Sequence, residues 1–187
     1  MAKIITFSGK AGAGKNVSAC FIRTGLQQRN VRVFEIAYAD WLKAILAKNF
    51  GYAEEKKKDF RNVLQHFGTD VVRNKDPDFW VKVVMMTVEL LKDEFDVFLL
   101  TDARFENELK PFVLGREHDV YNILVRRDNI FDLTSDQIKH SSEQLCEKDM
   151  SLFTSIIRND GSLADLCDKC DDYVDYFVSW IRESEVA

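Results

Sequence analysis

A glycine-rich segment follows the first apolar run of the chain and constrains the fold more than any other feature. The segment reads Gly9-Lys10-Ala11-Gly12-Ala13-Gly14-Lys15, with apolar residues 4–7 before it and a helical pattern after it. Its three glycines tolerate positive φ, so consecutive backbone N–H groups can curve around an anion at the positive end of the next helix. The pattern G-x-x-x-x-G-K between a strand and a helix predicts a phosphate-binding P-loop, in which Lys15 reaches the terminal phosphates of a nucleotide.

The residue after the P-loop lysine departs from the usual pattern. A Ser or Thr hydroxyl ordinarily ligates Mg²⁺ at this position, whereas this chain has Asn16. An amide oxygen projects farther than a hydroxyl, and Mg²⁺ keeps several waters in a tight octahedron. We therefore expect Asn16 to act through a metal-bound water.

Length and charge narrow the class of protein. A chain of 187 residues fits a single domain, here residues 1–187, with enough length to bury a substantial core. The net charge of −5 disfavours a large nucleic-acid footprint. No run of 18 uncharged apolar residues and no apolar leader occurs, so we expect a cytoplasmic protein that does not enter membranes. Cys167 and Cys170 form a C-x-x-C within a helical pattern, and no second pair completes a zinc site.

Hydrophobic patterning alternates between short strands and helices. Strands are expected at residues 3–8, 31–36, 96–102, 121–125 and 153–157. Helical patterns cover residues 15–28, 79–95 and 162–183, and a longer helical region, 41–95, separates the second strand from the third. Within it, the apolar period from residue 54 to Arg73 predicts one continuous helix. This alternation predicts an α/β fold, a five-stranded parallel sheet covered by helices.

Charged side chains follow several of these strands. Asp40 comes after the second strand, and the third, most apolar strand ends on Asp102 with Arg104 close behind. Arg126 and Arg127 follow the fourth. Open parallel sheets bind ligands at the carboxyl ends of their strands, so we expect these groups at one site beside the P-loop.

Taken together, these motifs resemble the phage deoxynucleoside monophosphate kinases and, more distantly, dephospho-coenzyme A kinase. The motifs run in order along nearly the whole chain: the P-loop, Ala39-Asp40, Phe67-Gly68-Thr69-Asp70 with Arg73, Asp76-Pro77-Asp78-Phe79-Trp80, Asp102 to Glu108, His140-x-Ser142-Glu143 and Asn159-Asp160-Gly161. The resemblance implies a P-loop kinase fold with a helical acceptor-binding insertion at 41–95 and a short lid at 126–142. It implies transfer of the ATP γ-phosphate to a deoxynucleoside 5′-monophosphate with Mg²⁺, in the host-cell cytoplasm if the chain is phage-encoded.

The resemblance also implies roles for individual residues. Lys15, Asp40, Asp102 and a lid arginine, Arg126 or Arg127, are expected to act in catalysis. Asn16, Asp40 and Asp102 are expected to hold Mg²⁺ through water. ATP contacts are expected from Gly9, Lys10, Ala11, Gly12, Ala13, Gly14, Lys15, Asn16, Val17, Asn159 and Gly161. Acceptor contacts are expected from Asp40, Gln65, Thr69, Arg73, Trp80, Arg104 and Glu108.

Most of these residues have a structural alternative. Asp40 and Asp102 are also suited to capping the helices that follow them. Arg73 is equally suited to a surface salt bridge, and either lid arginine to an exposed loop charge. Gln65 fits a helix surface and Trp80 a core. Asn159 and Gly161 also fit a strand-to-helix turn with Ser162 as the cap.

Two other functions stay open at this stage. One is a P-loop kinase for another acceptor, such as a modified base in DNA or a small molecule like dephospho-coenzyme A. The other is a nucleotide-binding regulator without catalysis, to which Asn16 gives some weight. The sequence specifies neither the preferred base nor the means of excluding ribose, and a homodimer stays open.

Overall fold

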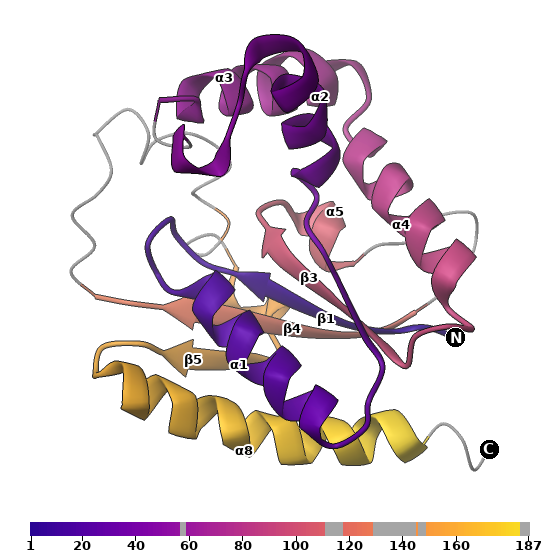
Figure 1. The fold of residues 1–187 in the computed structure, drawn as a ribbon, viewed down its shortest axis with the longest axis vertical. Coiled ribbons are helices and arrows are strands. Elements are labelled where there is room, and N and C mark those ends of the chain that lie inside the picture. Colours follow the sequence, from indigo (N-terminus) through magenta and orange to yellow (C-terminus); the bar gives the residue numbers. More distant parts are fainter. Residues whose placement is uncertain (57–58, 111–117, 129–144, 146–148, 184–187) are drawn as a thin grey trace.

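Five parallel strands form one sheet in the order β2-β3-β1-β4-β5 (Figure 1). The computed structural model describes residues 1–56, 59–110, 118–128, 145 and 149–183. The strands are β1 (Lys3–Ser8), β2 (Val33–Ile36), β3 (Val97–Ala103), β4 (Asp119–Arg126) and β5 (Ser155–Arg158). The α/β class and the five-stranded parallel sheet expected from the sequence are confirmed.

Strand β1 lies at the centre of the sheet. All six of its residues are buried, and it pairs in parallel with β3 on one side and β4 on the other. The hydroxyl of Thr6 donates to Asn122 Oδ1 at 2.7 Å, so this polar pair is satisfied within the core. The P-loop therefore begins at the carboxyl end of the most enclosed strand.

Helices cover both faces of the sheet (Figure 1). Helices α1 (Lys15–Gln28) and α8 (Leu163–Arg182) pack together on one face, and Gly25 lets them approach because a Cβ there would lie 2.7 Å from Val174. Helices α2 (Asp40–Phe50) and α4 (Phe79–Leu91) contribute to the core on the other face, next to the short α5 (Glu106–Leu109). A 3₁₀ turn, η4 (Met150–Leu152), precedes β5.

The segment between α2 and α4 is more broken than its periodicity predicts. Gly51 ends α2 in the left-handed conformation, as glycine at this position commonly does. A 3₁₀ turn η1 (Glu54–Lys56), a short α3 (Arg61–Gln65) and a π-helical stretch η2 (His66–Arg73) follow. The expectation of one continuous helix up to Arg73 is wrong. π-Helical segments are rare, and those that occur are often found at functional sites. The stretch η2 is therefore a candidate part of a functional site.

The remaining boundaries agree with the sequence within a few residues. The helix expected at 79–95 ends at Leu91, and the terminal helix expected at 162–183 spans Leu163–Arg182. The lid is expected at 126–142, and its residues 129–142 lie outside the described part of the chain. The motif formed by His140, Ser142 and Glu143 also lies outside it. The described helices include none that is long and apolar enough to cross a lipid bilayer.

Leu100 and Leu90 offer a matched test of the core. Leu100 in β3 is fully buried, whereas Leu90 in α4 is 81% exposed. Leu100→Ala should lower the free energy of unfolding by about 2–5 kcal/mol, because it removes buried methyl groups and leaves a cavity. Leu90→Ala should change it by less than about 0.5 kcal/mol. Urea unfolding measures both variants, and equal effects would contradict this account of the core.

Candidate functional site

The glycine-rich loop after β1 has the geometry expected of a P-loop. Gly9, Gly12 and Gly14 have φ of 147°, 82° and 104°, so all three take the positive values predicted for them. A Cβ on Gly9 would lie 2.2 Å from the carbonyl oxygen of Val125 in β4. Both the backbone conformation and the close approach to the neighbouring strand therefore require glycine at position 9.

Lys15 opens α1 and folds back over the loop. Its Nζ donates to the carbonyl oxygens of Gly9 at 2.6 Å and Lys10 at 3.0 Å, and the residue is buried. The ammonium group thus lies at the N-terminus of α1, beside the backbone N–H groups that the helix leaves unpaired. This is the position from which a P-loop lysine meets phosphate oxygens.

Asn159 supports the loop from behind. This buried residue donates from Nδ2 to the carbonyl oxygen of Ala13 at 2.9 Å. A Cβ on Gly14 would lie 2.4 Å from the same nitrogen, so the amide packs directly on the loop backbone. Gly161 belongs to the turn before α8, where Ser162 caps the helix together with Asp165, as the turn alternative predicts. The expected contacts of Asn159 and Gly161 with adenine stay predictions.

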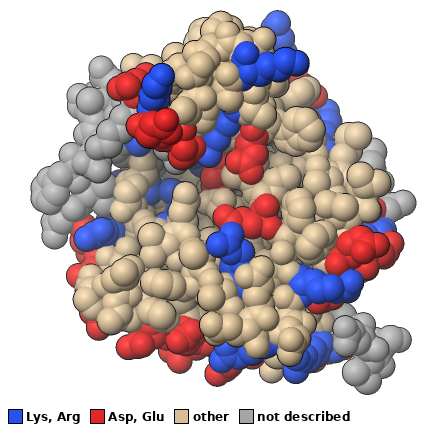
Figure 2. All heavy atoms as spheres, in the orientation of Figure 1, with Lys and Arg blue, Asp and Glu red and all other residues tan. Residues whose placement is uncertain are grey.

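A cavity of about 520 Å³ opens next to the loop. Figure 2 shows this face of the molecule hollowed below the helices at the top, with acidic and basic side chains gathered around the hollow. The lining comes from the P-loop with the start of α1, the segment before α2, the α3–η2 stretch and the end of β3. Segments distant in the sequence therefore meet at one edge of the sheet.

The cavity collects most of the residues singled out in the sequence. The predicted site residues in its lining are Ala11, Gly12, Gly14, Lys15, Asn16, Val17, Gln65, Thr69, Arg73, Trp80, Asp102, Arg104 and Glu108. The others, which do not line it, are Gly9, Lys10, Ala13, Asp40, Arg126, Arg127, Asn159 and Gly161. Arg126 and Arg127 are exposed at the end of β4, and Arg126 Nε lies 3.8 Å from Asp128.

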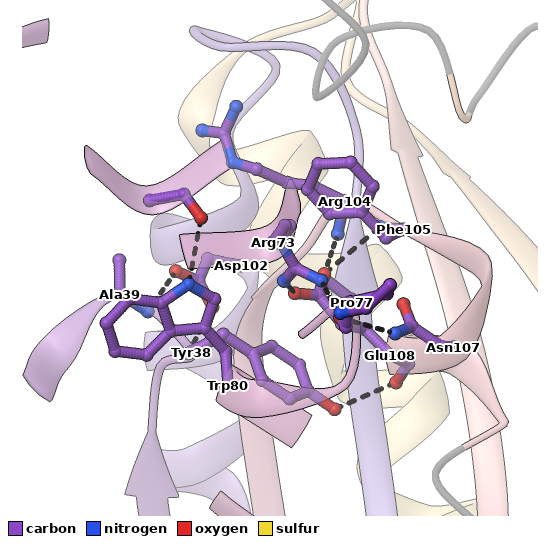
Figure 3. Close-up of polar contacts among 12 residues, drawn as sticks. Tyr38, Ala39, Arg73, Pro77, Trp80, Asp102, Arg104, Phe105, Asn107 and Glu108 are labelled. Carbon is purple, nitrogen blue, oxygen red and sulfur yellow. Dashed lines mark hydrogen bonds and ion pairs between the residues drawn. The ribbon is translucent and has the colours of Figure 1, made fainter. Parts of the chain in front are cut away.

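Asp102 joins the end of β3 to the segment before α2. Its two carboxylate oxygens accept from the backbone N–H groups of Tyr38, at 2.7 Å, and Ala39, at 3.1 Å. Figure 3 shows the three residues together. The alternative that Asp102 caps the following helix is wrong, because the N-cap of α5 is Phe105. Asp102 lines the same cavity as the P-loop, and each oxygen of an ionised carboxylate can accept more than one hydrogen bond.

Asp40 has a different place. It is the first residue of α2, after the N-cap Ala39, and its Oδ2 accepts from the backbone N–H of Ala37 at 2.8 Å. The alternative that Asp40 is the N-cap of α2 is therefore wrong, because Asp40 is the first residue of the helix. Its carboxylate closes the turn between β2 and α2, and its expected roles with metal and acceptor stay predictions.

Arg73 forms a buried ion pair with Glu108 (Figure 3). Their side chains are 9% and 2% exposed, so the pair does not lie on the surface, where the salt-bridge alternative places it. Arg73 also donates to the carbonyl oxygen of Pro77 at 3.0 Å and stacks on Phe105, 4.0 Å from the ring centroid. Trp80 likewise belongs to the core, and its Nε1 donates to the carbonyl oxygen of Gly68 at 2.9 Å.

Glu108 connects this ion pair to the loop after β3. One carboxylate oxygen meets Arg73, and the other accepts from the backbone N–H groups of Arg104 at 2.6 Å and Phe105 at 3.0 Å. Burial raises the pKa of Glu108 to about 7, an effect that exceeds the opposing influence of the Arg73 guanidinium and the two amides. The Asp102 carboxylate adds to the rise. The phenol of Tyr38, which donates to the Glu108 carbonyl oxygen at 2.9 Å, also has its pKa raised by burial.

Sequence reasoning missed part of the lining. The residues to which it gave no role are Ala37, Tyr38, Ala39, Leu42, Lys43, Arg61, Leu64, Gly68, Thr101 and Phe105. For Arg61 a signal was present, because it precedes Gln65, Thr69 and Arg73 at intervals of four residues. The aromatic and backbone contributions of Tyr38, Ala39 and Phe105 depend on how β2 and β3 pair, which sequence spacing does not reveal.

Two of the three residues expected to hold Mg²⁺ line the cavity, and the third, Asp40, does not. Asn16 and Asp102 both line it and offer the oxygen ligands that Mg²⁺ prefers. Within the described residues, no three His, Cys, Asp or Glu side chains form a metal-binding group. This small set of protein donors suits Mg²⁺, which commonly completes its octahedral coordination with water and substrate phosphates.

The raised pKa of Glu108 predicts a pH-dependent stability. The folded protein holds this proton more tightly than the unfolded chain, whose reference pKa is 4.5. The resulting stabilisation is complete below about pH 4.5 and is lost as the pH rises through about 7. The free energy of unfolding of the wild type minus that of Glu108→Gln should fall across this window by about 3 kcal/mol at most. Unfolding by urea at several pH values measures this difference, and a constant or rising difference would contradict the assignment.

Comparison with known proteins places the chain in a family. The sequence profile of deoxynucleotide monophosphate kinases matches residues 53–170. No curated protein sequence matches the chain. Among solved structures, dephospho-CoA kinase from Campylobacter jejuni is 16% identical, with a TM-score of 0.51 over 95% of this chain and 98% of that one. An APS kinase from Mycobacterium tuberculosis, solved with AMPPNP and APS, is 14% identical, with a TM-score of 0.45 over 93% and 98%. The fold is therefore that of the P-loop kinases, and the chain belongs to the deoxynucleotide monophosphate kinase family.

Proposed function

We propose that this protein transfers the γ-phosphate of ATP to a deoxynucleoside 5′-monophosphate with the help of Mg²⁺. Membership of the family supports nucleotide kinase activity. The observation that carries the finer proposal is that the P-loop and the α3–η2 segment line the same cavity. The profile match covers α3 and η2 but begins after the P-loop, so the family match and the loop geometry support the proposal independently.

In the proposed reaction, a phosphate oxygen of the acceptor forms a bond to the γ-phosphorus of ATP. The bond between that phosphorus and the oxygen bridging to the β-phosphate breaks, and ADP leaves with its electron pair. Such a transfer depends mainly on alignment and on neutralising charge at the equatorial oxygens. Lys15 and the loop N–H groups would hold the β- and γ-phosphates at the N-terminus of α1.

Asp102 and Asn16 would hold the hydrated Mg²⁺, because both line the cavity with oxygen donors. Bound Mg²⁺ neutralises charge on the phosphates of ATP and orients them. Asp102 is well placed for this role because two backbone N–H groups fix its carboxylate. A phosphate monoester has its second pKa near 6 and is mostly a dianion at pH 7, so the acceptor does not require Asp40 as a base.

Asn159 supports catalysis indirectly in this proposal. Its contact with the Ala13 carbonyl oxygen keeps the loop in the conformation that presents its N–H groups. Arg104 and Gln65 would contact the acceptor nucleotide, because both line the cavity and neither belongs to the P-loop. Arg73 would shape this wall through its buried pair with Glu108. Arg126 or Arg127 stays the proposed lid arginine.

An assay of ADP release over a panel of acceptors tests the function. The panel contains the four common deoxynucleoside monophosphates, duplex DNA and dephospho-coenzyme A, each at saturating ATP and Mg²⁺. We expect turnover with at least one deoxynucleoside monophosphate and none above background with the other two acceptors. Turnover only with DNA or with dephospho-coenzyme A would replace the proposed acceptor. Binding of ATP without turnover on any acceptor would favour a regulator.

Lys15→Ala tests the role of the P-loop in the same assay. The lysine charge matters most as the γ-phosphoryl group departs, so we expect turnover to fall by orders of magnitude. Lys92→Ala, which removes a partly exposed lysine paired with Glu89, is the matched control and should keep the parental rate. Melting temperatures show whether both variants fold. A folded Lys15→Ala protein with more than about a tenth of the parental rate, a loss under about 1.4 kcal/mol, would contradict the assignment.

A further inference from the structure

The α3–η2 wall presents its lining residues to the cavity at regular intervals of four. They form two rows, Arg61-Gln65-Thr69-Arg73 and Leu64-Gly68. An α-helix has 3.6 residues per turn, so each step of four residues rotates about 40° past a full turn. Over the two steps from Gln65 to Arg73 this drift would reach about 80°. A regular α-helix would therefore turn one end of the longer row away from the cavity.

The π-helical winding of η2 counteracts this drift. Hydrogen bonds in a π-helix close one residue later than in an α-helix, so each turn holds more residues. Residues four apart then rotate by less than a full turn instead of more. The α-helical step lies in α3 (Arg61–Gln65) and the π-helical steps lie in η2 (His66–Arg73), so the deviations have opposite sign. The change of winding thus keeps the longer row on the cavity.

A hydrogen bond from another helix enters η2 in its first turn. The Nε1 of Trp80, in α4, donates to the carbonyl oxygen of Gly68 at 2.9 Å. A side-chain donor that enters the backbone hydrogen-bond ladder of a helix disturbs its α-helical winding. Gly68 is buried, and a Cβ there would lie 3.0 Å from Leu42 Cδ2, so α2 packs closely at the same residue. The backbone at Gly68 is therefore held between α2 and α4.

The winding of η2 depends on contacts from outside it. The apolar periodicity of residues 54–73 is that of an α-helix, and π-helical segments are rare. The contacts of Arg73 with Glu108 and with the carbonyl oxygen of Pro77 fix the end of η2. The indole of Trp80 acts one turn earlier, at Gly68, next to Thr69. Its hydrogen bond is therefore placed to decide how the turn that carries Thr69 is wound.

We propose that Trp80 is a positioning residue for the acceptor nucleotide. Its hydrogen bond to Gly68 holds η2 in π-helical winding and so keeps Gln65 and Thr69 on the cavity together. The assignment rests on the proposed function, since it takes the ligand of this wall to be a nucleoside monophosphate. Trp80 acts through the wall rather than through its own N–H, because that N–H already has a partner in the protein.

Removing only the indole N–H tests the assignment. Replacement of Trp80 by β-(3-benzothienyl)alanine puts sulfur in place of the N–H and keeps the shape of the ring, so core packing is retained. Trp80→Phe is the second variant, and melting temperatures show whether both fold. In each, KM for the monophosphate should rise about fivefold or more, the size expected when one hydrogen bond to a ligand is lost. KM for ATP should stay within about twofold, because the P-loop is unchanged.

Trp180→Phe is the matched control. Trp180 lies in α8, where its ring packs 4.4 Å from Lys3 Nζ, and it does not line the cavity. This variant should keep both KM values. A double-mutant cycle then tests whether Trp80 acts through the wall. In a Gln65→Ala, Thr69→Ala background, Trp80→Phe should raise KM for the monophosphate no further, because the side chains that it positions are absent.

A crystal structure of the benzothienylalanine protein gives a readout that is independent of activity. Residues 66–73 should show α-helical hydrogen bonds in this protein, and Thr69 should be turned away from the cavity. Retention of the π-helical winding would overturn the assignment, because the winding would then not depend on the indole N–H.

Three kinetic results would also overturn it. The first is an unchanged KM for the monophosphate, and the second is an equal rise in both KM values. The third is an undiminished effect of Trp80→Phe in the Gln65→Ala, Thr69→Ala background. If the wild type phosphorylates a monophosphate, each of these results refutes the role of Trp80 alone. A wild type that phosphorylates no monophosphate would refute the proposed function and the acceptor role together.

Discussion

Parallel pairing of β1 on both of its sides is the constraint on which the site depends. Because β1 lies between β3 and β4 in parallel register, the carboxyl ends of all three strands meet at one edge of the sheet. That edge brings the P-loop beside Asp102 and forces Gly9 against the Val125 carbonyl oxygen. The loop can therefore present its N–H groups only while the strand pairing holds, and binding is built on the most buried part of the molecule.

The α3–η2 wall of the cavity is held by buried polar contacts in addition to apolar packing against the core. The π-helical η2 ends at Arg73, and the ion pair with Glu108 connects it to the loop after β3. Glu108 also accepts two backbone N–H groups of that loop, while Asp102 does the same for the segment before α2. Two carboxylates thus fix three segments around one cavity. The cost of burying Glu108 appears as its raised pKa.

The sequence predicted the sheet well because parallel strands and their helices leave strong periodic signals. The positive φ of the P-loop glycines and the cap at Ser162 were also predictable, since each depends on local residue chemistry. The break of the 54–73 segment into three elements was not, because apolar periodicity does not separate α- from π-helical winding. Nor could the sequence show that Arg73 is neutralised by Glu108, 35 positions away, because that pairing depends on tertiary contacts rather than on residue type.

The central claim is that donor and acceptor share this one cavity and meet at the P-loop. The most direct measurement is a crystal structure with a bisubstrate analogue, in which adenosine and a deoxynucleoside are joined by a chain of five phosphates. The account predicts that the phosphate chain starts at the P-loop N–H groups and Lys15 and runs through the cavity, with the deoxynucleoside against Gln65 and Thr69. A deoxynucleoside end bound outside the cavity, or a phosphate chain that does not touch the P-loop, would contradict it.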